Sequence, residues 1–520
     1  MRARAIMVLG TSSHVGKSLL TAALCRIFAD QGVRVAPFKS QNMSLNSAAT
    51  VEGLEIGRAQ ALQAEAARIP ASVHMNPILL KPSGDMTSQV VVRGKIWGQL
   101  SASNYHLRRV EELMPMVCES YDILARQNEV MVLEGAGSPA EINLKQRDIV
   151  NMRMAEMADA PCLLVGDIDR GGVFASLYGT VQLLDPSEQA RIHGFIINKF
   201  RGDQALLQPG IRMIEDRLGK PCVGVVPWLH GLALEEEDSL GLPAIDASPW
   251  ARIDGPERPL RIAVVALPSF SNFTDFDALR QEPCVDLRLC RTPSQLADAD
   301  VIILPGSKQT VDDLLWMRRE TLDAAIRFHA KHGLVVGVCG GMQMLGSSIL
   351  DPEGIEHAGQ TEALGLLPFR TRMNPKKVTR QATGQLNAPC LFGQPISPIA
   401  VRGYEIHIGE TFYETEAQSF SILQNGERDG CLSSDTRIFG TYLHGIFDDD
   451  SFRHAFLVAA RGFHSLAPAA SLGNWKQKRE ESFNRLTDAV RRSLDLSRIF
   501  AMVGLKYSHP ERHEPVETSR

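Results

Sequence analysis

Short apolar runs alternate with amphipathic segments over about the first 230 residues of the chain. The runs are continuous rather than alternating in polarity, which is typical of strands buried on both faces of a parallel sheet. Segments such as Ser18–Asp30 and Ile211–Leu218 separate them and predict covering helices. The expected strands are Ala5–Leu9, Val33–Phe38, Val130–Leu133, Cys162–Val165, Gly194–Ile197 and Cys222–Val226.

A second pattern of the same kind begins at about residue 260. Before it, residues 231–259 contain the acidic run Glu235–Asp238, and we predict a linker there, with a substrate-facing loop as the alternative. Beyond residue 464 we expect an amphipathic helix at Asn474–Leu494 and a frayed tail at His509–Arg520. The strands expected in this second part are Leu260–Ala266, Val301–Leu304, Leu334–Val338 and Ile438–Leu443.

These patterns predict an α/β protein with two parallel-sheet domains, at residues 1–230 and 260–464. The segment 465–520 is expected to pack on the second domain or to trail from it. A length of 520 residues is enough for two to four domains.

Composition narrows the class of protein. The net charge of −5 argues against a nucleic-acid binder, which would carry a basic domain or stripe. No apolar run approaches the ~20 residues that are needed to cross a bilayer. The nine cysteines form no C-x-x-C pair, and Met1–Leu9 lacks the pattern of a signal peptide. We therefore expect a cytoplasmic enzyme without nucleic-acid or membrane partners. Its oligomeric state stays open, a homo-oligomer included.

The first expected strand runs into the glycine-rich segment Gly10–Ser18, and a helix follows. Backbone N–H groups of such a loop, together with the helix N-terminus, bind phosphate. The loop is one residue longer than G-x-x-x-x-G-K-[ST], and a chance Gly-Lys-Ser is the alternative. The position between strand and helix favours ATP binding. The residues expected to bind it are Gly10, Thr11, Gly16, Lys17 and Ser18.

Polar residues at other strand ends are further candidates, because ligands bind at the carboxyl ends of parallel strands. Glu134 is expected to complete a Mg²⁺ site with Ser18, rather than to be a solvated strand end. Asn198 is a candidate for reading adenine or for capping its turn. Candidates for substrate or metal contacts are Lys39, Asn42, Asp167 and Asp169, with a structural turn as the alternative for the two aspartates.

A candidate nucleophile follows the strand Leu334–Val338. Gly337-Val338-Cys339-Gly340-Gly341 fits a G-x-C-x-G elbow, the thiol counterpart of the nucleophile elbow of hydrolases. A helix N-terminus raises the thiolate fraction of such a cysteine, whereas an inert buried cysteine is the alternative. The Gly340 N–H is the expected oxyanion donor, and the loop containing Gly306 the source of a second.

The general base should be a histidine distant in sequence. His444, at the end of the strand Ile438–Leu443, is the favoured candidate, and His407 is its rival. The alternative for His444 is a structural role, and for His407 it is a structural or substrate-facing role.

The segment Gly337–Gly346 together with His444 resembles the triad-type class I glutamine amidotransferases, and Gly10–Ser18 with Glu134–Gly137 resembles the dethiobiotin synthetase-like ligases. Both in this order resemble the cobyric acid synthase family. Three further segments carry the likeness to that family: Phe38–Asn46, Gly166–Gly172 and Gly403–His407. The resemblance implies a P-loop NTPase-type amidoligase domain followed by a class I glutamine amidotransferase domain.

The same resemblance implies a reaction. ATP and Mg²⁺ would activate four propionates of adenosylcobyrinic acid a,c-diamide as acyl phosphates, and ammonia from Cys339-dependent glutamine hydrolysis would amidate them. Ordinary triad enzymes carry a Glu two residues after the histidine, where this chain has Ile446, so the group that orients His444 is not identified. The alternatives are an a,c-diamide synthase and a nucleotide-switched partitioning ATPase, the latter giving Cys339 no role.

Overall fold

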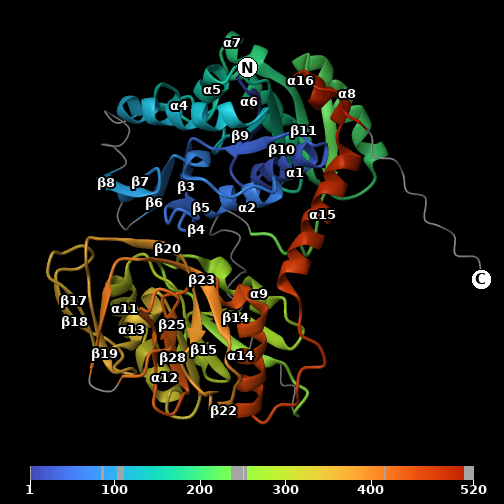
Figure 1. The fold of residues 1–520 in the computed structure, drawn as a ribbon. Coiled ribbons are helices and arrows are strands. Elements are labelled where there is room, and N and C mark those ends of the chain that lie inside the picture. The colour runs from blue at the N-terminus through green and yellow to red at the C-terminus, as the bar shows by residue number, and fades with distance from the viewer. Residues whose placement is uncertain are drawn as a thin grey trace, which may run out of the picture.

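The computed structural model describes residues 2–82, 87–101, 110–235, 250, 255–414 and 417–508. Two α/β units lie one above the other, and the long helix α15 (Trp475–Ser493) runs along one side from the second unit to the first (Figure 1). Residues 236–238 of the acidic run, most of the expected linker and the tail from residue 509 lie outside the described residues.

The first unit is built on a six-stranded, fully parallel sheet, and all six predicted strands are confirmed. Successive residues of β1 face opposite sides, so Met7 and Leu9 join one core and Ile6 and Val8 the other. In sheet order the strands are β12 (Cys222–Pro227), β11 (Ile192–Phe200), β10 (Cys162–Asp167), β1 (Arg4–Gly10), β9 (Val130–Glu134) and β2 (Val35–Phe38).

Helices cover both faces of this sheet, as continuous apolar strands require. The core on one face includes residues of α4 (Val110–Gln127), α5 (Met152–Met157), α6 (Val173–Gln182) and α8 (Gln204–Leu218). The core on the other face includes residues of α1 (Lys17–Asp30), α2 (Arg58–Ala66), α15 and α16 (Leu496–Met502).

The C-terminal segment corrects one expectation. The predicted helix over Asn474–Leu494 is present as α15, but most of its apolar face packs on the first unit, while its first turn also contacts the second. Phe483, Leu486 and Val490 belong to the same buried cluster as Leu24 and Phe28 of α1. The amphipathic pattern predicted the helix and its apolar face, whereas the partner of that face depends on where the preceding chain crosses between the units.

Small insertions between β2 and α4 face the second unit. A four-stranded sheet contains β3 (Gln41–Met43), β6 (Ile78–Pro82), β7 (Thr87–Val92) and β8 (Lys95–Ser101). The hairpin of β4 (Ser47–Ala49) and β5 (Glu55–Gly57) contacts strands of the second unit. The sequence patterns did not predict these short strands.

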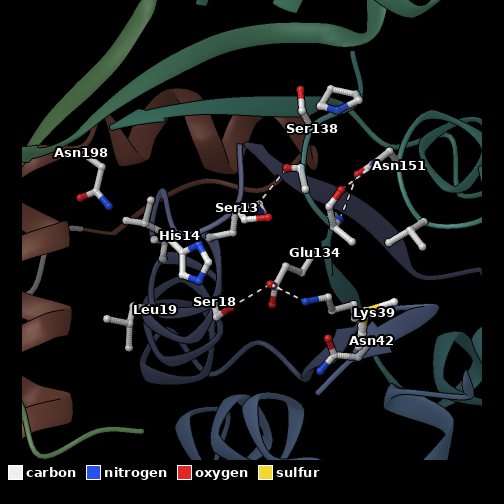
Figure 2. Close-up of a pocket in the computed structure, with 18 of the residues that line it drawn as sticks. Ser13, His14, Ser18, Leu19, Lys39, Asn42, Glu134, Ser138, Asn151 and Asn198 are labelled. Carbon is white, nitrogen blue, oxygen red and sulfur yellow. Dashed lines mark hydrogen bonds and ion pairs between the residues drawn. The ribbon is translucent and has the colours of Figure 1, made fainter. Parts of the chain in front are cut away.

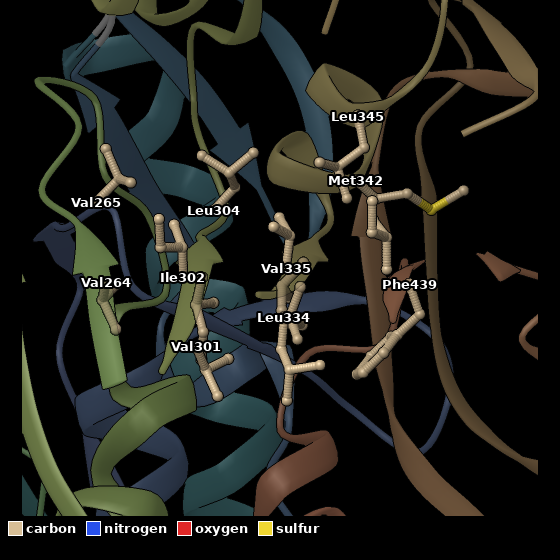
Figure 3. Packing of buried hydrophobic residues seen from close by; sticks show 14 of the residues in the cluster. Val264, Val265, Val301, Ile302, Leu304, Leu334, Val335, Met342, Leu345 and Phe439 are labelled. Carbon is tan, nitrogen blue, oxygen red and sulfur yellow. The ribbon is translucent and has the colours of Figure 1, made fainter. Parts of the chain in front are cut away.

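The second unit contains the four predicted strands, within one or a few residues at their ends. Their side chains pack with the helix after β16 in one continuous core (Figure 3). The sheet order is β14 (Val285–Cys290), β13 (Leu260–Val265), β15 (Val301–Leu304), β16 (Leu334–Val338), β28 (Ile438–Thr441) and β27 (Cys431–Leu432), the last antiparallel. The helices are α9 (Asp277–Arg280), α10 (Pro293–Leu296), α11 (Thr310–Arg319), α12 (Leu322–His329), α13 (Gly340–Leu345) and α14 (Asp450–Phe463).

Two small sheets not predicted from the sequence lie between α13 and β27 in the chain, the first mixed and the second antiparallel. One contains β17 (Ser348–Asp351), β18 (Gly359–Glu362), β19 (Phe369–Arg372) and β24 (Glu410–Tyr413). The other contains β20 (Val378–Leu386), β23 (Ala400–His407), β25 (Ser421–Leu423) and β26 (Arg428–Asp429).

Candidate active sites

The glycine-rich loop forms the turn between β1 and α1, as the sequence predicts. Gly16, at the helix N-cap, has a φ of 94°, and a Cβ there would lie 2.2 Å from Nδ2 of Asn198. Only glycine fits this conformation and this contact. The Lys17 ammonium donates to the carbonyl oxygens of Ser12 (2.9 Å) and Gly137 (3.2 Å), so it lies across the loop that a phosphate would enter.

Glu134, at the end of β9, lies at the centre of a buried polar cluster (Figure 2). Its Oε1 accepts hydrogen bonds from the Ser18 hydroxyl (2.8 Å) and the Lys39 ammonium (3.1 Å). Its Oε2 accepts from Nε2 of Gln63 on α2 (2.6 Å). Ser18 and Glu134 are thus in direct contact, while their predicted role as Mg²⁺ ligands stays a prediction. Gln63 was not among the predicted residues, because it comes from a helix with no recognisable motif.

A cavity of about 820 Å³ opens beside this cluster. Its wall includes cations from several separate segments and Leu486 of α15, so the C-terminal helix contributes to the site. The predicted residues that line it are Gly16, Lys17, Ser18, Lys39, Asn42, Glu134 and Asn198.

Asn198 supports the loop directly, because its Nδ2 donates to the Val15 carbonyl at 2.8 Å. Its expected contact with adenine stays a prediction. Asp167 accepts from the Lys199 ammonium at 3.0 Å and from the backbone N–H of Asp169, while Asp169 pairs with Arg201. This pattern fits the structural-turn alternative for both aspartates, neither of which lines the cavity.

In the second unit, Cys339 stands on the predicted elbow between β16 and α13. Its φ of 52° and ψ of −111° are strained for a residue with a side chain. Gly341 makes this turn possible, since a Cβ there would lie 2.0 Å from the Leu304 carbonyl oxygen of β15. The thiol is buried, and its sulfur lies 3.6 Å from the Ile406 carbonyl oxygen.

His444 reaches Cys339, as predicted, and the structure identifies the group that orients it. Asp275, in the short 3₁₀ helix Phe273–Phe276, accepts from Nδ1 of His444 at 2.7 Å and from the Gly445 N–H at 2.9 Å. Burial lowers the pKa of His444, but the Asp275 carboxylate and the hydrogen-bonded Cys339 raise it to about 10. The imidazole is therefore held protonated beside the sulfur.

Asp275 was missed because it precedes His444 by 169 residues and belongs to no known local motif. The available signal was a polar and aromatic segment, Ser269–Asp277, which begins shortly after β13 ends at Val265. The structure also explains the glycine at position 403, within the segment Gly403–His407. A Cβ there would lie 2.3 Å from the His444 carbonyl oxygen. Tyr404 and His444 exchange backbone hydrogen bonds at 3.0 and 2.9 Å.

The remaining predictions for this site lie close together. A Cβ on Gly306 would lie 3.1 Å from Cε1 of His444, and one on Gly340 would lie 2.9 Å from the Ser307 nitrogen. Both segments predicted to supply oxyanion donors therefore lie next to Cys339 and His444. The rival His407 stacks on Tyr442 with ring centroids 3.8 Å apart, and its Nδ1 lies 3.1 Å from the Gly409 carbonyl oxygen.

A small cavity beside Cys339 is lined by both units. Lys81 of β6 and Gln89 of β7 come from the first unit, and the rest of the wall comes from the second. The lining residues of the second unit include Ser307, Lys308, Gln343, Glu356, Lys377 and His444.

Comparisons with known proteins agree with this architecture. Residues 6–241 match the CobQ/CobB/MinD/ParA nucleotide binding domain, and residues 261–452 match the CobB/CobQ-like glutamine amidotransferase domain. Cobyric acid synthase of Thermoanaerobacter sp. is 47% identical, covering 96% of this chain and 98% of the relative. Those of Moorella thermoacetica (47%; 97% and 98%) and Citrobacter koseri (48%; 96% and 98%) are similar to the same extent.

The two units thus define an ATP-dependent ligase that takes its nitrogen from glutamine. The chain belongs to the cobyric acid synthase family, whose members carry out amidation in cobalamin biosynthesis. No helix in the described part of the chain is long and apolar enough to span a bilayer.

Proposed function

We propose that this enzyme amidates the four peripheral propionates of adenosylcobyrinic acid a,c-diamide, with ATP activating each carboxylate at the first unit and glutamine supplying ammonia at the second. The observation that carries the proposal is the pairing on one chain of the Lys17–Glu134 cavity with the Cys339–His444–Asp275 arrangement. The identity of the corrinoid rests on the family.

The first unit would activate the carboxylate. A carboxylate resists attack by ammonia because it is anionic and has no good leaving group. Transfer of the γ-phosphoryl group of ATP gives an acyl phosphate, a step that depends mainly on positioning and electrostatics. Lys17 and the N–H groups of the loop would offset the charge that develops on the phosphoryl oxygens.

Ser18 and Glu134 fit Mg²⁺, which prefers oxygen ligands and usually keeps waters and substrate phosphates beside one or two protein groups. Their mutual hydrogen bond brings both oxygen donors to one place at the cavity wall. The ion would neutralise phosphate charge.

The second unit would release ammonia. The Cys339 sulfur attacks the glutamine amide carbon, and the protonated His444 donates its proton to the departing nitrogen. Asp275 accepts from Nδ1, which leaves Nε2 as the atom that exchanges the proton with sulfur, nitrogen and later water. The N–H groups near Gly340 and Gly306 would stabilise the oxyanion.

We also propose a cytoplasmic location. All nine cysteines are free, which suits a reducing compartment.

The test compares two nitrogen sources. Cys339→Ala should abolish glutamine-supported corrinoid amidation and leave ammonium-supported amidation near the level of the unaltered enzyme. Lys17→Ala should abolish both. The proposed division of labour fails if Cys339→Ala removes both activities or neither, as followed by chromatography of the corrinoid product.

A further inference from the structure

Two polar residues of the first unit face the thiol of the second. Lys81 and Gln89 are direct cross-strand partners on β6 and β7, so their side chains lie on the same face of the small sheet. Both are about 95% buried and both line the cavity that contains Cys339 and His444. The amidotransferase cavity is therefore incomplete without the first unit.

The amide oxygen of Gln89 is buried and has no hydrogen-bond partner among the described residues. An unpaired buried acceptor costs about 1–3 kcal/mol, so such a group in a cavity wall points to a ligand that donates to it. Glutamine carries N–H donors at both of its ends.

Charge in the same wall has both signs. Lys81 donates to Glu55 at 2.8 Å, and Glu55 also pairs with Lys377, which directly precedes β20 of the second unit. Lys308 and Glu356 complete the wall. Three ammonium groups and the Glu356 carboxylate therefore line the cavity, with Glu55 behind Lys81 and Lys377. Such a wall offers partners to both the carboxylate and the ammonium of an α-amino acid.

The surroundings of two of these groups disfavour their charged forms. Burial, aided by Lys377 and Lys81, lowers the pKa of Lys308 to about 8, and burial raises the pKa of Glu356 to about 7. A zwitterion placed between them would stabilise the charged form of each.

We propose that the first unit completes the glutamine-binding site, with the Gln89 amide oxygen accepting a hydrogen bond from bound glutamine beside the Glu55–Lys81–Lys377 ion pairs. This inference rests on the proposed function of Cys339. It implies that glutamine binds well only when the two units are docked, which couples hydrolysis to the ligase without any additional domain.

The test replaces Gln89 with Met, which keeps its length and removes the amide. The KM for glutamine in ATP-dependent amidation should rise about 3- to 10-fold, as expected for one lost hydrogen bond. Ammonium-supported amidation should stay within about twofold of the unaltered enzyme, which also reports correct folding. Gln89→Asn, which withdraws the oxygen by one methylene, should raise the same KM and replaces the Met variant if that protein does not fold.

Gln381→Met is the matched control. Gln381 donates to the Ala49 carbonyl across the same interface but does not line the cavity. The KM of the Gln381→Met enzyme for glutamine should therefore not change. An unchanged KM in a folded Gln89 variant would overturn the inference. The inference would also be overturned if the KM stayed unchanged while the rate of glutamine hydrolysis exceeded the rate of amidation. That result would instead assign Gln89 to the passage of ammonia. If Cys339→Ala kept glutamine support, the proposed function itself would fail.

Discussion

Nδ1 of His444 lies 2.7 Å from Oδ2 of Asp275, although 169 residues separate the two in the chain. Both side chains are almost fully buried, and the other Asp275 oxygen accepts from the Gly445 backbone. The carboxylate therefore fixes the ring and the backbone that carries it. Cys339, His444 and Asp275 therefore form a triad, in which the aspartate comes from the 3₁₀ helix that follows β13.

Asp275→Asn should lower kcat for glutamine hydrolysis by about 10²–10⁴-fold, because an amide that donates to Nδ1 favours the wrong tautomer. Ammonium-supported amidation should be retained. Asp277→Asn is the control, since Asp277 lies two residues away and pairs with Arg280 rather than with His444. Equal losses in the two variants, measured by glutamate release, would contradict an orienting role for Asp275.

The raised pKa of His444 also predicts how stability depends on pH. Burial lowers this pKa, but Asp275 and Cys339 together raise it from an ordinary 6.5 to about 10. A group with a raised folded-state pKa contributes stability that is complete below about pH 6.5 and is lost as the pH rises through about 10. The difference in urea midpoint between the unaltered protein and His444→Gln should be largest near pH 6 and shrink toward pH 10. A difference that grows with pH would contradict the protonated state.

Glu134→Gln should weaken the use of Mg²⁺, because it replaces an anionic oxygen donor by a neutral amide in the proposed site. The Mg²⁺ concentration that gives half-maximal amidation should rise by about tenfold or more with either nitrogen source. Glutamine hydrolysis without ATP should change little, since Cys339 belongs to the other unit. An unaltered Mg²⁺ titration would exclude Glu134 as a ligand.

Phe483→Ala should destabilise the first unit by about 3–5 kcal/mol, the usual cost of removing a buried aromatic ring. Phe483 is 1% exposed and packs in the core that also contains Leu24 and Phe28. In calorimetry, ATP should identify the unfolding transition of the first unit by shifting it. The Phe483→Ala variant should move that same transition to lower temperature. Lys476→Ala, at an exposed position on the same helix, should leave it in place. A shift confined to the other transition would place α15 on the second unit.

The candidate residues that sequence reasoning found are those whose chemistry depends on local geometry. A phosphate loop needs a strand, a glycine turn and a helix in succession, so Gly16, Lys17 and Ser18 can be recognised within nine residues. Cys339 is recognisable for the same reason, because its elbow needs small residues immediately after a buried strand. Gln63 and Asp275 carry no such local constraint.

The sequence by itself determined the six strands of the first sheet, four parallel strands of the second and the two loops at their carboxyl ends, because hydrophobic periodicity and turn chemistry act over a few residues. Only the tertiary structure decided that α15 crosses to the first unit, that Asp275 orients His444 and that Lys81 and Gln89 close the thiol cavity. Each of these depends on how buried surfaces from distant segments fit together. The sequence alone allows a carboxylate or amide many hydrogen-bond partners, and the packing of the folded chain selects one of them.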